Sequence, residues 1–342
     1  MTPSELLCQP LMMQESAVLS LIDETVRAML KPGQSSPQGM AMPAAAPLLE
    51  VAIYDEQGQR LMPQVEVDQE TGEQRVSEVE TEGREPKSLI AVVPLSGVMT
   101  RHGYRGWWSS RPGTVDIGRA LMKLNRDPAI HTIILQVSSP GGSVTGTPEL
   151  SQCIYEIREE GETEILSVVD DLMASAATYA ATAAKRVYSI PSAYSGSVGT
   201  LISYTSYDRM LKENGIDVEY LRTPEKKNRF TGVEPMTEDM RDTLRDRIES
   251  SQAWFIRDMA RNRNVSEAHV NKQFGQGEVM RADEAVDARL IDEIASLDDV
   301  VLMQAEAVQK GKQSSRRRKM QQRMDDAVAE QKELETTVGT EG

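Results

Sequence analysis

Histidine, cysteine and long apolar runs are all scarce in this chain. Its 342 residues include three histidines and two cysteines. Cys8 and Cys153 lie far apart, so they indicate neither a disulfide framework nor the spacing of metal ligands, and Cys153 falls in an amphipathic pattern typical of a core residue. No uncharged run approaches the roughly 18 apolar residues of a membrane span. We therefore expect no membrane span.

The charge balance and the N-terminus further restrict which kind of protein this can be. The formal net charge is −15, which argues against a general nucleic-acid binder. The N-terminus lacks the basic start and the cleavage site of a signal peptide. We expect a soluble intracellular protein whose length allows one sizeable α/β domain plus extensions.

A buried strand followed by a glycine turn organises the middle of the chain. Residues 133–137 form a nearly continuous apolar run, as buried parallel strands do. Pro140, Gly141 and Gly142 follow directly. Proline fixes φ and the glycines allow a sharp turn with bare N–H groups, which is half of an oxyanion hole. A plain turn is the simpler interpretation of the same residues.

A second β-rich run leads into a helix that contains one well-placed serine. Residues 165–169 predict a strand, and the alanine-rich residues 174–185 predict a closely packed helix. Ser175 at the start of that helix is the candidate nucleophile, and the N–H groups of Ala176 and Gly142 are the candidate oxyanion donors. A serine among alanines is otherwise only a small packing residue.

The sequence contains few histidines that could act as the base for this serine. The three histidines are His102, His131 and His269, and none lies between Ser175 and His269. His131 precedes a buried strand at the end opposite to the glycine turn, which predicts a structural or solvent-facing role. A Ser-His-Asp triad stays geometrically possible, but a neutral lysine is the better candidate base.

Three ordered motifs resemble the signal peptide peptidase A family of serine peptidases (S49), which includes the head maturation proteases of tailed bacteriophages. The motifs are Gln136-Val-Ser-Ser-Pro-Gly-Gly142, Met173-Ala-Ser-Ala-Ala-Thr-Tyr-Ala-Ala181 and Ser195-Gly-Ser-Val-Gly199. The resemblance covers roughly residues 88–295. It implies an α/β fold related to Clp protease and crotonase, with repeated ββα units and a mostly parallel sheet flanked by helices. It also implies a Ser-Lys dyad and no cofactor.

Carried over to this sequence, the resemblance places the nucleophile at Ser175 and the base at Lys227. Lys226 is the alternative base, because the glycine and the aromatic residue that usually precede the lysine are absent here. The residues expected to contact substrate are Gly141, Ser143, Ser195, Gly196 and Ser197. Ser195 and Ser197 are more typical of turns than of catalysis.

The remaining sequence divides the chain into four parts. Residues 1–46 predict an extension with an amphipathic helix over 15–30 and a linker, and residues 47–87 predict a hairpin and an acidic connector. Residues 88–300 contain the peptidase-like domain. Residues 301–342 predict a charged, helical or disordered, scaffold-like tail, which from about residue 303 has too few aromatic and β-branched residues to bury a core.

Within the peptidase-like part, apolar patterns predict further elements. We expect helices over 114–125 and 207–214, a helix capped by Thr237, and strands at 88–99, 186–190, 198–204 and 217–221. The tryptophan-bearing loop 103–113 is expected to line a peptide groove, to pack at a subunit contact, or to anchor in the core.

These features lead to one main functional hypothesis and two alternatives. The main one is a Ser-Lys endopeptidase that cleaves scaffold, portal or major capsid proteins during phage head maturation. It would act in the host cytoplasm, inside the assembling procapsid, as a homo-oligomeric ring. The alternatives are a cytoplasmic peptidase that clears signal-peptide or other fragments, and a catalytically silent capsid assembly or scaffolding factor.

Overall fold

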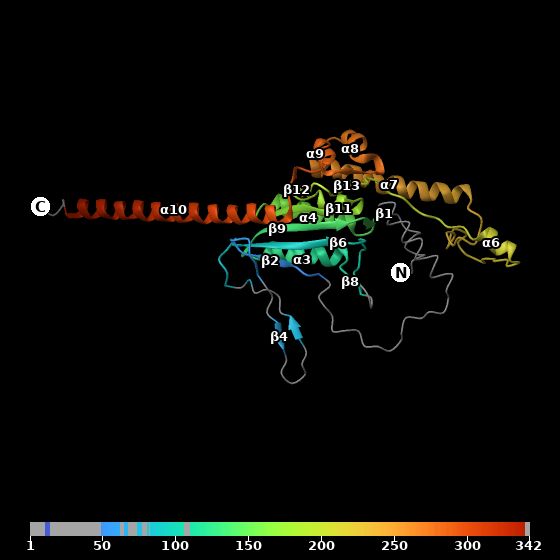
Figure 1. Cartoon of the computed structure of the whole chain (residues 1–342), viewed down its shortest axis with the longest axis horizontal. Coiled ribbons are helices and arrows are strands. Elements are labelled where there is room, and N and C mark those ends of the chain that lie inside the picture. Colours follow the sequence, from blue (N-terminus) through green and yellow to red (C-terminus); the bar gives the residue numbers. More distant parts are fainter. Residues whose placement is uncertain are drawn as a thin grey trace.

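The computed structural model describes residues 11–13, 49–61, 65–67, 74–76, 81, 83–105 and 110–338. The helix expected over 15–30 and the tryptophans of the 103–113 loop lie outside these residues. A nine-stranded sheet forms the body, in the order β14-β13-β11-β9-β6-β2-β3, with β12 pairing β11 and β15. Figure 1 shows this sheet with helices packed beside it and with α10 projecting from one end.

The centre of the sheet is parallel. Its main strands are β6 (Leu89–Ser96), β9 (Ile130–Ser139) and β11 (Glu164–Ala174), and β6, β9 and β11 pair in parallel. β12 (Arg186–Ser189) and β13 (Tyr194–Gly196) both pair in parallel with β11, at its two ends. The mostly parallel α/β fold expected from the sequence is therefore confirmed.

Short strands, most of them antiparallel to their neighbours, complete the edges of the sheet. β2 (Ala52–Tyr54) pairs with β6, and β3 (Arg60–Leu61) pairs with β2, so the hairpin expected near residues 48–65 is present and extends the main sheet. β14 (Val279–Arg281) pairs with β13, while β15 (Glu293–Ile294) joins β12 in parallel.

Three short strand pairs lie outside the main sheet. β4 (Val65–Val67) pairs with β5 (Gln74–Val76) inside the expected acidic connector. β7 (Tyr104–Arg105) pairs with β8 (Ser110–Arg111). β1 (Leu11–Met13) pairs with β10 (Gly141–Ser143).

The side chains of the central strands point alternately to the two faces of the sheet, and both faces are apolar. In β6, Ala91, Val93 and Leu95 belong to the larger core cluster, whereas Ile90 and Val92 belong to the smaller one on the other face. The larger cluster includes residues of α3 (Thr114–Arg126), α4 (Thr147–Glu160), α5 (Ala176–Ala181) and α7 (Glu238–Arg263). The smaller one is covered by α10 (Leu297–Val338). The remaining helices are α6 (Asp208–Glu213), α8 (Glu267–Gln273), a 3₁₀ turn (Gly275–Gly277) and α9 (Ala282–Asp287).

The first turns of α10 correct one expectation from the sequence. Ala305 and Val308 are buried, and the Thr132 hydroxyl donates to Gln304 Oε1 at 3.0 Å. Lys312 pairs with Glu85 at 2.8 Å. The expectation that the chain cannot bury a core from about residue 303 onward is therefore wrong for these turns, because small aliphatic residues on one helical face are enough to cover the sheet.

Two expected strands are absent, and the serine helix is shorter than expected. Residues 198–204 and 217–221 form no strand of the described sheets, although Leu201 makes an isolated bridge. The helix expected over 174–185 contains only Ala176–Ala181. The cap at Thr237 is confirmed, since its hydroxyl accepts a hydrogen bond from the Met240 N–H.

Candidate active site

The glycine turn forms one wall of the candidate site. β9 ends at Ser139, and Gly141 then adopts φ 97°, which glycine tolerates without strain. The Met99 N–H donates to the Gly141 carbonyl and the Ser143 N–H donates to the Met99 carbonyl, both at 2.8 Å. Successive residues of a strand direct their N–H and carbonyl groups to opposite sides, so those of Gly142 face away from Met99. The Gly142 N–H is therefore aimed at whatever lies on the far side of β10.

Only glycine fits at position 142. A Cβ atom on Gly142 would lie 2.0 Å from the Met99 carbonyl oxygen, a distance that no side chain can accommodate. This close approach of two main chains explains the second glycine of the Pro-Gly-Gly motif in physical terms.

Ser175 lies at the sharp junction between β11 and α5. It is fully buried, and its φ of 55° and ψ of −113° are rare for any residue other than glycine. Its N–H donates to the Gly196 carbonyl at 2.9 Å, and its Oγ donates to the Gly199 carbonyl at 3.3 Å. The Ala176 N–H follows at the first position of α5, where backbone N–H groups have no partner within the helix. A serine in this setting has a fixed direction and an anion-stabilising neighbour.

The serine helix and the glycine strand contact each other. α5 packs against β9, β10 and β11. The fold therefore brings together the elements that carry Ser175, Ala176 and Gly142, as the order of the motifs predicts.

The 195–199 turn braces the serine from the other side. Gly196 accepts hydrogen bonds from the Ser175 N–H and, at 2.8 Å, from the Thr178 hydroxyl. Ser197 has φ 52° and its N–H donates to the Glu278 carbonyl at 2.6 Å. Ser195 is buried in β13, and its Oγ has no hydrogen-bond partner among the residues that the structure describes. Ser195 and Gly196 therefore hold the serine turn in place through β13, and neither is exposed.

A cavity opens beside this turn. Its volume is about 550 Å³, and it is lined by Gly199, whose carbonyl accepts the Ser175 hydroxyl, together with Thr200, Gln252 and Ile256. No residue that lines it carries a formal charge. The cavity therefore suits an uncharged side chain close to the serine.

The two candidate lysines lie away from Ser175. Both are exposed in the segment between α6 and α7, which Figure 1 shows extending beyond the sheet at the far end of α7. Lys226 Nζ pairs with Asp239 Oδ1 at 3.2 Å, and the Lys227 N–H donates to the Pro224 carbonyl. Among the described contacts, none joins either lysine to Ser175. One copy of the chain therefore does not assemble the Ser-Lys pair.

The histidines do not supply a base either. His131 Nδ1 contacts the Thr132 hydroxyl at 2.7 Å near the start of β9, and burial lowers the pKa of His131. His269 Nε2 lies 2.8 Å from the Ala288 carbonyl. Within the described part of the chain, no hydrogen bond joins His102, His131 or His269 to Ser175. His131 lies near the start of β9, at the end opposite to the glycine turn, and is partly buried.

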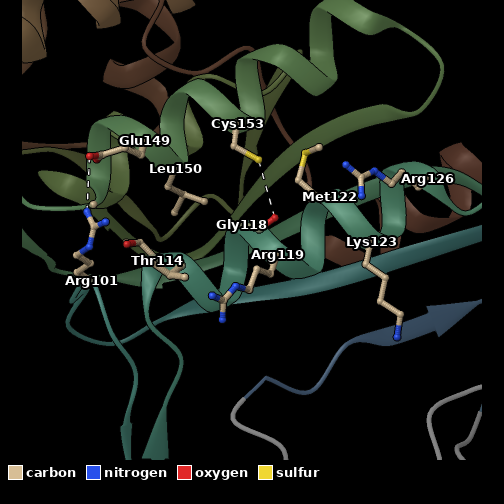
Figure 2. Close-up of a pocket in the computed structure, with 12 residues that line it drawn as sticks. Arg101, Thr114, Gly118, Arg119, Met122, Lys123, Arg126, Glu149, Leu150 and Cys153 are labelled. Atoms are coloured by element: carbon tan, nitrogen blue, oxygen red, sulfur yellow. Dashed lines mark hydrogen bonds and ion pairs between the residues drawn. The ribbon is translucent and has the colours of Figure 1, made fainter.

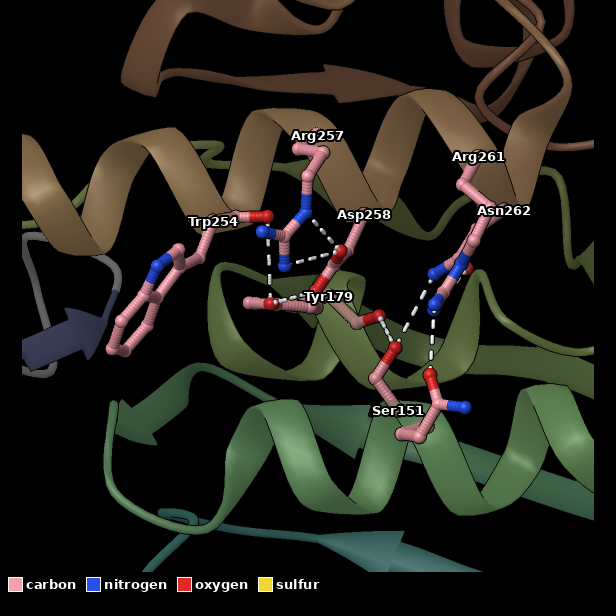
Figure 3. A network of polar contacts seen from close by, with 8 residues as sticks. Ser151, Tyr179, Trp254, Arg257, Asp258, Arg261 and Asn262 are labelled. Carbon is pink, nitrogen blue, oxygen red and sulfur yellow. Dashed lines mark hydrogen bonds and ion pairs between the residues drawn. The ribbon is translucent and has the colours of Figure 1, made fainter.

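A buried polar network connects the serine helix to α7 (Figure 3). The Tyr179 hydroxyl donates to Asp258 Oδ2 at 2.5 Å, and Arg257 Nε donates to Asp258 Oδ1 at 2.9 Å. Burial, followed by the hydrogen bond to Asp258, raises the pKa of Tyr179. From α4, the Ser151 hydroxyl donates to the Tyr179 carbonyl at 3.1 Å. This network fixes α5, and with it the direction of Ser175.

The sequence analysis missed Asp258, although a signal was present. Asp258 lies on the same side of α7 as Phe255 and Met259, and all three residues are buried. A carboxylate on an apolar stripe requires a buried partner. Tyr179, also in the sequence motif around the serine, is that partner.

A second cavity lies between α3 and α4 (Figure 2). Its volume is about 560 Å³, and Arg101, Arg119 and Lys123 are among its lining residues. Cys153 points toward the Gly118 carbonyl, with its Sγ 3.9 Å from that oxygen, and burial raises the pKa of the Cys153 thiol to about 11. The thiol is therefore protonated and packs against the core, as expected.

The described residues offer no metal site and no transmembrane helix. Among them, no group of three or more histidine, cysteine, aspartate or glutamate side chains is placed to hold a metal ion. None of the helices described is both long and apolar enough to cross a membrane.

Comparison with known proteins identifies relatives of this chain. Residues 158–311 match the model of peptidase family S49, a span that contains Ser175 and both lysines and ends on α10 just past its buried turns. Capsid assembly protease C of Escherichia phage lambda is 25% identical over 220 residues, which cover 64% of this chain and 49% of that protein. The head-tail preconnector protein of Enterobacteria phage P21 is 24% identical over 220 residues, covering 64% of this chain and 43% of the relative.

A bacterial relative is similar at the same level. Protease 4 of Haemophilus influenzae is 26% identical over 185 residues, covering 54% of this chain and 30% of that protein. The chain thus spans about half or less of the length of these curated relatives.

Proposed function

Because this chain carries a peptidase family S49 domain, we propose that it is a serine endopeptidase that cleaves scaffold, portal or major capsid proteins during assembly of a phage head. The observation that carries the proposal is Ser175 itself, which is buried at a strained strand-to-helix junction on a helix that packs against the strand of Gly142. The names of the two phage relatives support a setting in capsid assembly. We place the protein inside the procapsid, in the host cytoplasm.

In the proposed mechanism, Ser175 Oγ attacks the carbonyl carbon of the scissile peptide bond while neutral Lys227 Nζ accepts the hydroxyl proton. The N–H groups of Gly142 and Ala176 hold the oxyanion that forms. Lys227 then gives the proton to the leaving amine. A water molecule, deprotonated by the same lysine, hydrolyses the acyl ester and Ser175 regains its proton. Lys226 is the alternative base.

We propose that the lysine reaches Ser175 from a neighbouring subunit of a homo-oligomeric ring. The segment that carries Lys227 is exposed in the single chain, and α6 contains no buried residue. Several large apolar side chains of α6 and of the residues that follow it face solvent, with Leu221 92% exposed and Met210 and Ile216 about half exposed. An exposed apolar arm of this kind favours burial against a second copy. That contact would also remove the lysine from water, which favours its neutral form.

The cavity beside Gly199 supports a preference for substrates with an uncharged side chain near the scissile bond. Thr200 and Gln252 give it polar groups and Ile256 an apolar wall, but no lining residue would pair with a charged side chain. Burial of an unpaired charge there would cost several kcal/mol, on the order of a hundredfold or more in rate.

The decisive experiment is co-expression with the products of the neighbouring capsid genes. Wild type should process one of them, and the Ser175→Ala and Lys227→Ala variants should not. Lys226→Ala serves as the matched control, because Lys226 is adjacent and is also exposed but pairs with Asp239. If Lys226→Ala abolishes cleavage and Lys227→Ala does not, Lys226 is the base. If wild type leaves every partner uncut but assembles with them, the scaffolding alternative replaces the peptidase.

Mixed oligomers test the origin of the lysine. When Ser175→Ala and Lys227→Ala chains are unfolded, mixed in equal amounts and refolded together, a site shared between subunits recovers about a quarter of the wild-type activity. A site completed within one chain recovers none. Activity should also fall as the pH is lowered and the lysine becomes protonated, and a flat profile from about pH 5 to pH 9 would contradict a lysine base.

A further inference from the structure

The N-terminal segment pairs with the strand that carries the candidate oxyanion donor. β1 runs antiparallel to β10, with Leu11 opposite Ser143, Met12 opposite Gly142 and Met13 opposite Gly141. The other side of β10 is occupied by Met99, which exchanges two hydrogen bonds with Gly141 and Ser143. β10 therefore lies between Met99 on one side and β1 on the other, and β1 is more than a hundred residues away in the sequence.

The register places Met12 opposite the functional N–H of the site. The carbonyl of Gly141 and the N–H of Ser143 face Met99, so the N–H and carbonyl of Gly142 face β1. In an antiparallel pair, two residues whose main-chain groups face each other exchange both of their hydrogen bonds. The main chain of Met12 thus lies where a bound peptide would offer its carbonyl to Gly142.

We propose that β1 is an intramolecular pseudosubstrate, which fills the peptide-binding strand position of the active site and must leave before another protein is cleaved. The inference rests on the proposed function of the same site. The ligand class is an extended peptide main chain, recognised by addition of a strand to the edge of β10 that faces away from Met99. Such binding depends on main-chain hydrogen bonds, so one site accepts both the protein's own segment and a capsid-protein segment.

Covalent attachment makes this short strand effective. Three residues bind weakly on their own, but attachment to the same chain gives an effective concentration on the order of 1 mM. If a free peptide of this sequence binds with a Kd of about 0.1 mM, the attached strand lowers the availability of the site by about tenfold. That is enough to delay cleavage until a substrate segment is delivered at a high local concentration, as inside an assembling particle.

The test uses two proline substitutions at adjacent positions in the full chain. Met12→Pro removes the N–H that faces the Gly142 carbonyl and puts a ring in its place, so β1 can no longer pair. Met13→Pro is the matched control, because the N–H of Met13 points away from β10 and β1 pairs with no other described strand. Both variants are made in a Ser175→Ala background, so that binding is measured without cleavage.

The probe is a fluorescein-labelled peptide with the sequence of residues 9–16, followed by fluorescence anisotropy. We expect it to bind the Met12→Pro chain about tenfold more tightly than the parent, and the Met13→Pro chain like the parent. Hydrogen exchange followed by mass spectrometry should show loss of protection in the segment containing Gly142 only for Met12→Pro. Equal binding and equal protection in all three chains would overturn the proposal.

Repeating the comparison with Ser175 intact separates the two proposals. A roughly tenfold gain in kcat/KM for Met12→Pro supports both. If peptide binding rises with Met12→Pro but no variant cleaves any protein or peptide, the strand site stands and the peptidase function falls. If wild type cleaves as fast as Met12→Pro and binds the probe equally well, the peptidase function stands and the pseudosubstrate falls.

Discussion

Replacement of Ser175 by glycine should abolish activity and yet give a more stable protein than replacement by alanine. Ser175 holds φ at 55° and ψ at −113°, a conformation in which a Cβ atom is strained. The Ser175 N–H bond to Gly196 and the Tyr179 N–H bond to the Ser175 carbonyl, both 2.9 Å long, maintain this conformation whatever the side chain. Alanine keeps the strained Cβ atom, whereas glycine removes it.

The expected difference follows from two opposing terms. A residue held in a sparsely populated region costs about 1–3 kcal/mol, and glycine relieves that cost. Glycine also loses more backbone entropy on folding, which costs about 0.5–1 kcal/mol relative to alanine. The hydroxyl bond to Gly199, 3.3 Å long, is lost in both variants and cancels. The free energy of unfolding of Ser175→Gly should therefore exceed that of Ser175→Ala by about 1 kcal/mol.

Urea unfolding followed by circular dichroism, at one fixed protein concentration, measures this difference. With a slope of about 2 kcal/mol per molar urea, 1 kcal/mol shifts the midpoint by about 0.5 M. Ser251, a buried serine inside α7, is the control, because there glycine should be less stable than alanine by about 1 kcal/mol. The reasoning is refuted if the order of the glycine and alanine variants is the same at both positions.

Three further predictions concern other parts of the molecule. Gly142→Ala should abolish cleavage and lower the Tm, since its Cβ would lie 2.0 Å from a backbone oxygen. Gly118 lies inside α3, and a Cβ atom there would lie 4.0 Å from Leu150, which is an ordinary contact. Gly118→Ala should therefore raise the free energy of unfolding by about 1 kcal/mol and with it the Tm. Thermal melts in the opposite order would contradict this. Burial raises the pKa of Asp292, but the hydrogen bonds and charge of Arg263 outweigh it and hold the pKa below its ordinary value. Its contribution to stability is therefore present above about pH 4 and lost as the pH falls through the folded-state pKa, so Asp292→Asn should flatten the acid limb of stability against pH; an unchanged slope would count against this assignment. Finally, the Cys153 thiol, with a pKa of about 11, should resist iodoacetamide at about pH 8 in the native state and react in urea, measured by mass spectrometry on a Cys8→Ser background; rapid native labelling would show that the thiol is not buried as described.

The central strands and the serine turn could be predicted from the sequence because their signals are local. The apolar runs that became β6, β9 and β11 must be buried on both faces wherever they lie, and the glycines at 141 and 142 restrict the chain to a tight turn. The order of these elements then brings Ser175 near Gly142, since parallel strands end at the same edge of the sheet.

Elements that depend on a distant partner could not be predicted in this way. Residues 198–204 and 217–221 have the composition of strands, but composition does not supply a partner strand, and in the described chain neither segment joins a sheet. In the opposite direction, the alanines and valines at the start of α10 look too sparse for a core, yet they complete one because the sheet already presents Ile90, Ile134 and Val168 to them.

The sequence by itself determined which residue is the nucleophile candidate, where the chain must turn around it, and that the fold is a mostly parallel α/β sheet. Tertiary structure alone decided that β1 lies against Gly142, that Tyr179 is tied to Asp258, and that Lys227 stays away from Ser175 within one chain. The physical reason is that sequence patterns report on local conformation and on burial. They do not report which of many possible partners is within reach once the sheet has formed, because each of those contacts joins residues far apart along the chain.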